Sequence, residues 1–153
     1  MADPMEGCVM LALSTFRKSE EAVRTAMQKA KTTKKLCIVF VADVNLARYF
    51  VGAEHAPWDE LEKMCETDML KLHEEQGLGC IKEIADKARL EGIEVEHVVQ
   101  IGRFAPVCLD LANKWRPSSI VTTRSRRPAW VKKFFGAPVD ELIEKAGCPV
   151  LVV

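Results

Sequence analysis

Arginine side chains gather in one stretch of this 153-residue sequence, and they are the residues whose type and spacing could do chemistry. Residues 103–133 include eight basic residues and one acidic residue. Arg124, Arg126 and Arg127 directly follow a segment with the pattern of a strand. A guanidinium group suits phosphate or carboxylate, so these three side chains could clamp an anion. A basic loop that is simply solvated would have the same sequence, and both interpretations stand at this point.

Residue patterns typical of catalysis or of a bound metal are missing from the sequence. There is no Gly-Lys-Ser/Thr phosphate-binding loop, and the three histidines are scattered. The six cysteines have no metal-ligand spacing, and Cys8, Cys37 and Cys108 fall inside apolar stretches. Cysteines in such positions typically behave as small buried hydrophobic residues, and their thiols stay reduced in a reducing compartment. We therefore expect no metal ion, no required cofactor and no catalytic residues, and we do not expect an enzyme.

The composition is that of an ordinary globular domain and argues against nucleic-acid and membrane partners. Hydrophobic residues make up 48% and charged residues 29% of the chain, whose formal net charge is zero. A neutral protein has no overall field that attracts nucleic acid or a membrane surface. The longest apolar runs are far shorter than the roughly 20 residues that cross a bilayer. Residues 1–7 lack the features of a signal peptide, so we expect a cytoplasmic protein.

Segments with the patterns of strands and helices alternate along the chain, which predicts a parallel sheet covered by helices. The apolar run 36–42 is typical of a central strand buried on both faces. Ser19 is a candidate N-cap, with Glu20 and Glu21 in the first turn after it. The expected strands are 8–13, 36–42, 93–101, 118–123 and 149–153, and the expected helices are 19–32, 59–91, 105–115 and 138–146.

The longest of these helical patterns, residues 59–91, is rich in Glu and Lys. Gly77 and Gly79 weaken its middle, so the segment could form one helix or a kinked or split one. Gly92 is suited to end it, because glycine readily adopts the conformation of a helix C-terminus.

The last part of the chain carries motifs of a known family. Residues 147–153 read Gly-Cys-Pro-Val-Leu-Val-Val, and this ending resembles the last strand of the universal stress proteins. Nucleotide-binding members of that family carry G-x2-G-x9-G-[S/T] after the fourth strand. On this chain the pattern falls on Thr123, Arg126, Gly136 and Ala137, so the spacing is intact but one residue of four matches. The resemblance covers residues 7–153.

The resemblance also implies where a nucleotide would lie, at the carboxyl ends of the strands. Ser14 takes the position of an acidic residue that contacts the nucleoside, and Val41 the position whose backbone reads the adenine edge. Thr123 and Arg126 put side chains where a phosphate loop is bare, and Ala137 lacks the hydroxyl that could donate to phosphate. The candidate degenerate pocket comprises Ser14, Val41, Thr123, Arg124, Arg126, Arg127, Gly136 and Ala137.

A further position that resembles the family is the glycine turn after the third strand, at Gly102. The acidic residue and the proline that commonly follow this turn in the family are Arg103 and Phe104 here.

We therefore expect one universal-stress-protein-like domain over residues 1–153, with residues 1–6 as a flexible N-terminal extension. The expected fold class is α/β: a three-layer sandwich around a five-stranded parallel sheet of order 3-2-1-4-5, Rossmann-like or flavodoxin-like. The strand Val150–Val153 would be a short apolar edge, and family members often dimerise through this strand, so we expect a homodimer.

Three functions are compatible with these residues. The first is a non-catalytic stress-response or regulatory protein that acts through dimerisation and contacts with a protein partner, with weak or absent ATP binding. The second is a nucleotide or other anion binder that uses Arg124, Arg126 and Arg127. The third is an enzyme of the wider adenine-nucleotide hydrolase class, which would rest on the fold alone.

Overall fold

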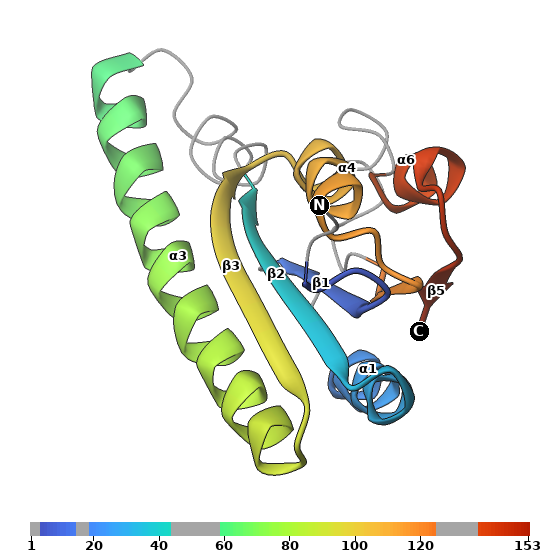
Figure 1. The fold of residues 1–153 in the computed structure, drawn as a ribbon. Coiled ribbons are helices and arrows are strands. Elements are labelled where there is room, and N and C mark those ends of the chain that lie inside the picture. Colours follow the sequence, from blue (N-terminus) through green and yellow to red (C-terminus); the bar gives the residue numbers. More distant parts are fainter. Residues whose placement is uncertain (1–3, 15–18, 44–58, 125–137) are drawn as a thin grey trace.

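A five-stranded parallel sheet with helices on both faces organises the chain (Figure 1). The structure is a computed structural model that describes residues 4–14, 19–43, 59–124 and 138–153, without the side chains of residues 43, 59–73 and 138. The strand order is β3-β2-β1-β4-β5, which confirms the predicted order and fold class. The strands are β1 (Val9–Ser14), β2 (Lys35–Asp43), β3 (Glu94–Gly102), β4 (Ser119–Thr122) and β5 (Val150–Val152). The helices are α1 (Glu20–Thr33), α3 (Asp59–Leu90), α4 (Phe104–Trp115) and α6 (Pro138–Lys145).

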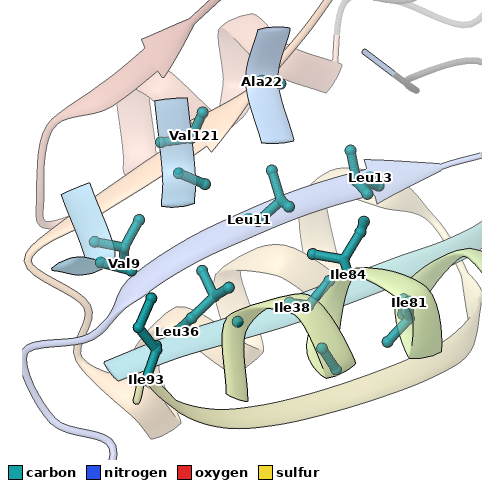
Figure 2. Close-up of a cluster of buried hydrophobic side chains, with 14 of the residues drawn as sticks. Val9, Leu11, Leu13, Ala22, Leu36, Ile38, Ile81, Ile84, Ile93 and Val121 are labelled. Atoms are coloured by element: carbon teal, nitrogen blue, oxygen red, sulfur yellow. The ribbon is translucent and has the colours of Figure 1, made fainter. Parts of the chain in front are cut away.

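Each face of the sheet buries its own hydrophobic core. Successive side chains of a strand point to opposite faces, so Ile38 of β2 lies in one core and Val39 in the other. The first core is covered by α1 and α3, and Figure 2 shows Ile81 and Ile84 of α3 packed over β1 and β2. The second core is covered by α4 and α6 and contains Trp115. All side chains from 36 to 42 are fully buried, which confirms the predicted central strand.

Helix α1 begins and ends as its sequence predicts. The Ser19 hydroxyl accepts a hydrogen bond from the Ala22 N–H at 3.2 Å, which satisfies one of the unpaired donors of the first turn. Glu20 and Glu21 place negative charge at the positive end of the helix dipole. Lys34 closes the helix in the left-handed region, with φ 64°, and its N–H donates to the Ala30 carbonyl. The predicted N-cap is therefore confirmed.

Helix α3 is one continuous helix of 32 residues, so the interpretation of 59–91 as a split helix is wrong. The reason lies in where its glycines stand. A methyl group at Gly77 would overlap the ring of Phe40 in β2, with Cε1 and Cγ both at 2.7 Å. Gly77 therefore lets α3 pack closely on the sheet. Gly79 has open space around its Cα and simply continues the helix, and Gly92, with φ +78°, follows its end as predicted.

The segment before β1 packs under the carboxyl end of α4. Met5 is buried in the second core, and the Gly7 N–H donates to the Arg116 carbonyl at 3.0 Å. Trp115 is buried in the same core, and its indole Nε1 has no hydrogen-bond partner among the described residues. These contacts fix the end of α4, where Arg116 takes a left-handed conformation with φ 46°.

The cysteines found in apolar stretches are structural. Cys8, Cys37 and Cys108 are fully buried, which confirms the prediction, while Cys80 and Cys148 are partly exposed. In the part of the chain that the structure describes, no three His, Cys, Asp or Glu side chains are grouped to hold a metal ion. None of the helices in these same ranges has the length and apolarity that a membrane span requires.

Candidate functional site at the carboxyl edge of the sheet

The strand order reverses at β1, which has β2 on one side and β4 on the other. The ladder between β1 and β2 continues to the last residue of β1, whereas the ladder between β1 and β4 stops at Leu11 and Val121. Past that point a side chain makes the connection, because the buried Thr122 hydroxyl donates to the Ala12 carbonyl at 2.9 Å. In doubly wound sheets, ligands bind outside the carboxyl ends of strands at such a reversal.

The structure brings Ser14 and Val41 together at this edge. They are register partners across the β1–β2 ladder, and both are buried. Ser14 is the last residue of β1, so its hydroxyl lies where the strand meets the loop. Ser14 is only 2% exposed, so an acidic side chain in its place would bear the cost of burying a charge. The serine hydroxyl can donate and accept a hydrogen bond without that cost. The position predicted to contact a nucleoside is therefore polar but uncharged.

Thr123 uses its hydroxyl within the protein. Its Oγ1 donates to the Val153 carbonyl at 2.7 Å, and the Val153 N–H donates to the Thr122 carbonyl at 3.0 Å. The residue at the first glycine position of the motif is therefore bound to the residue that follows β5. This hydrogen bond gives a structural reason for a threonine there.

Arg124 lies beside the first turn of α6 and pairs with Asp140. Its Nη1 is 3.3 Å from the Asp140 carboxylate, and the two side chains are 57% and 58% exposed. Pairs this exposed contribute only about 0–1 kcal/mol to stability, so Arg124 is held loosely. Asp140 and Val153 were not among the residues predicted for the site. An acidic residue in the first turn of a predicted helix at this edge was the available signal for Asp140.

The other half of the predicted pocket is not placed. Arg126, Arg127, Gly136 and Ala137 lie outside the described residues. The structure thus positions Ser14, Val41, Thr123 and Arg124 at one edge of the sheet, with the first two adjacent. That any of the eight binds a ligand stays a prediction.

The start of α4 adds positive potential to the same edge. Arg103 is the N-cap of α4 and makes no side-chain cap, and the first turn has no acidic residue. By contrast, α1 is capped by Ser19. A Cβ at Gly102 would lie 2.8 Å from Val107 Cγ2, so the glycine before Arg103 allows β3 and α4 to meet closely. The edge near α4 therefore combines a helix N-terminus with a basic side chain.

Comparisons with known proteins agree with this architecture. The sequence profile of the universal stress protein family matches residues 8–153. A sequence comparison with curated proteins finds no match. The solved structure of the universal stress protein UspA from Lactobacillus plantarum is similar with a TM-score of 0.69 at 15% identity, covering 97% of this chain and 98% of that one.

Two further similar structures are complexes with nucleotides. A universal stress protein in complex with cAMP gives a TM-score of 0.58 at 15% identity, covering 97% of each chain. A universal stress protein family protein from Arabidopsis thaliana with AMP bound gives 0.53 at 14% identity, covering 95% of this chain and 90% of that one. Identities this low show a shared fold.

Proposed function

Because the chain belongs to the universal stress protein family, we propose that it is a non-catalytic stress-response or regulatory protein of the cytoplasm. It acts through dimerisation and contacts with a protein partner, and it binds ATP weakly or not at all. One observation carries the last point: the Thr123 side chain occupies the first glycine position and its hydroxyl is bound to Val153. A phosphate loop works by close approach to bare backbone N–H groups, which a Cβ obstructs.

Calorimetry with ATP, ADP and AMP on phosphate-free protein tests this proposal. We expect a dissociation constant for ATP weaker than about 1 mM, which corresponds to a binding free energy of only about −4 kcal/mol. Mass spectrometry of the denatured protein is expected to find no copurified nucleotide, and labelled ATP is expected to turn over no faster than in buffer. Micromolar ATP binding would contradict the proposal.

Nucleotide or anion binding through arginine is the second candidate. Two similar structures are complexes with cAMP and AMP, and Arg124 is exposed two residues after the end of β4. If this candidate holds, affinity is micromolar and Arg126→Ala weakens it about tenfold, the loss of one charge-assisted contact. Arg89→Ala is the matched control, because Arg89 is an exposed arginine of α3 that pairs with Asp86. Equal effects of the two substitutions would point to a nonspecific charge effect.

The proposed homodimer forms through the strand Val150–Val153. In the described sheet β5 is an edge strand that pairs only with β4, and its three residues are partly exposed. The resemblance of the last strand to that of the family implies dimerisation through this strand. An unpaired apolar edge offers backbone donors and acceptors to a second copy.

Light scattering at micromolar concentration is expected to give the mass of a dimer, and Val152→Pro is expected to give a monomer. The Val153 N–H donates to β4, so the N–H of Val152 points away from β4 and is available to a partner. Proline removes that donor, whereas Val152→Ala keeps it and serves as the control. If the unmodified protein is a monomer, the dimer is ruled out. If Val152→Ala is also a monomer, side-chain contacts and not backbone hydrogen bonds hold the dimer together.

A further inference from the structure

Helices α4 and α6 lie side by side on one face of the sheet (Figure 1) and contact each other. Between their carboxyl ends they leave an open groove of about 700 Å³. The groove exists because its lining is small at the crossing, with Ala112 on α4 and Ala146 and Gly147 after α6. Helices of a parallel sheet run opposite to the strands, so this groove lies at the amino edge. It is therefore separate from the candidate nucleotide site.

The floor of the groove is apolar and its rim is basic. Leu109, Ala112 and Ala146 pack with their inner sides against the second core and leave their outer sides in the groove. Arg116 and Lys145 stand on the rim, and none of the lining residues is acidic. The exposed lining as a whole is mixed, because Asn113, Arg116 and Lys145 add polar surface around this floor. The volume of the groove falls in the range of roughly 300 to 1,000 Å³ that small-molecule sites occupy.

The two rim cations are not equivalent. Lys145 Nζ lies 3.1 Å from a Glu141 carboxylate oxygen, so part of its charge is already compensated. Arg116 is exposed and makes no ion pair with a described carboxylate. Its backbone is fixed at both ends, since its N–H donates to the Ala112 carbonyl at 2.9 Å and its own carbonyl accepts from Gly7. The helix carboxyl ends add partial negative charge here, so an anion would depend on Arg116 for its attraction.

We propose that this groove is a second ligand site, which takes a small apolar anion such as a medium-chain carboxylate. The apolar chain lies on Leu109, Ala112 and Ala146, and the carboxylate pairs with Arg116. The charge of the ligand follows from Arg116, the rim cation that no described carboxylate pairs with, and its apolar part follows from the floor. The proposal is independent of what binds at the carboxyl edge.

Cys148 is a built-in reporter of this site because it lines the groove and is partly exposed. Burial, with a smaller effect of the neighbouring Cys8 thiol, raises the pKa of Cys148, so alkylation is slow at neutral pH and faster at alkaline pH. Cys80 is also partly exposed but lines a separate groove between α1 and α3 on the other face. Cys80 is therefore an internal control in the same molecule.

The experiment alkylates the full chain with N-ethylmaleimide and quantifies each cysteine by peptide mass spectrometry, with decanoate or decanol present below micelle-forming concentrations. We expect saturating decanoate to slow the alkylation of Cys148 about fivefold or more and to leave the alkylation rate of Cys80 unchanged. Decanol is expected to protect Cys148 less than decanoate does.

Arg116→Gln is expected to raise the decanoate dissociation constant about tenfold, as for one lost charge-assisted contact, and to leave decanol binding unchanged. Arg116→Lys, which keeps the charge, retains most of the affinity. Lys114→Gln is the matched control, since Lys114 is exposed on α4 outside the groove.

Three results would overturn the proposal. Decanoate that protects Cys80 as well as Cys148 would indicate detergent-like binding. If Arg116→Gln leaves the decanoate affinity unchanged, the groove does not bind the carboxylate group through Arg116. Protection of Cys148 that grows with protein concentration in the absence of decanoate would show that a second copy covers the groove.

Discussion

Replacing Gly77 with alanine is expected to destabilise the protein by about 1–3 kcal/mol, the usual cost of overpacking a core. The same change in an unconstrained helix would stabilise it by up to about 1 kcal/mol. The sign reverses because a Cβ at Gly77 would overlap Phe40, with two ring carbons at 2.7 Å. Phe40 is 0% exposed and packs in the first core, so its ring cannot move aside without displacing neighbours. Urea unfolding measures the free energy of both proteins.

Gly79 supplies a matched control two residues along the same helix. A methyl group there meets nothing within 4 Å, so Gly79→Ala is expected to stabilise the protein by about 0.5–1 kcal/mol. Adding Phe40→Leu to Gly77→Ala makes room for the methyl group, and the double-mutant cycle is expected to show favourable coupling of about 1 kcal/mol. If Gly77→Ala and Gly79→Ala both stabilise the protein, the close packing of α3 on β2 is wrong.

The pair of glycines also shows what local sequence patterns can and cannot predict. Apolar runs, the Ser19 cap and the Gly92 stop depend on neighbours within one element, so the helices and strands begin and end close to where they are predicted. Helix propensity is equally local and treats Gly77 and Gly79 alike. The contact between Gly77 and Phe40 arises only when α3 packs on β2, which no local pattern contains.

The same limit applies to the candidate site. The resemblance to the family identifies Ser14 and Val41 as candidates, and the pairing of β1 with β2 brings them together at a shared edge. The partners of Thr123 and Arg124 are different, since Val153 and Asp140 reach them only through the packing of β5 and α6. The motif spacing locates the loop, and the fold then determines which of its side chains are already bound within the protein.

Introducing the family's glycine-rich loop is expected to strengthen ATP binding, which we propose to be weak or absent in the natural sequence. The change is Thr123→Gly, Arg126→Gly and Ala137→Ser together, which removes two side chains and adds a hydroxyl donor. We expect at least about tenfold tighter ATP binding by calorimetry, equivalent to about 1.4 kcal/mol. The substitution at 123 also deletes the hydrogen bond to the Val153 carbonyl, so the variant is expected to lose about 1 kcal/mol of stability.

Thr123→Val separates these two consequences. Valine removes the hydroxyl but keeps the Cβ, so it is expected to lose the hydrogen bond to Val153 and gain no ATP affinity. Tighter binding in Thr123→Val would mean that release of the loop from β5, and not access to its backbone, limits ATP binding. If the folded triple variant binds ATP no better than the natural sequence, the loop is not the limiting part. The buried, uncharged Ser14 at the predicted nucleoside position is then the next residue to replace.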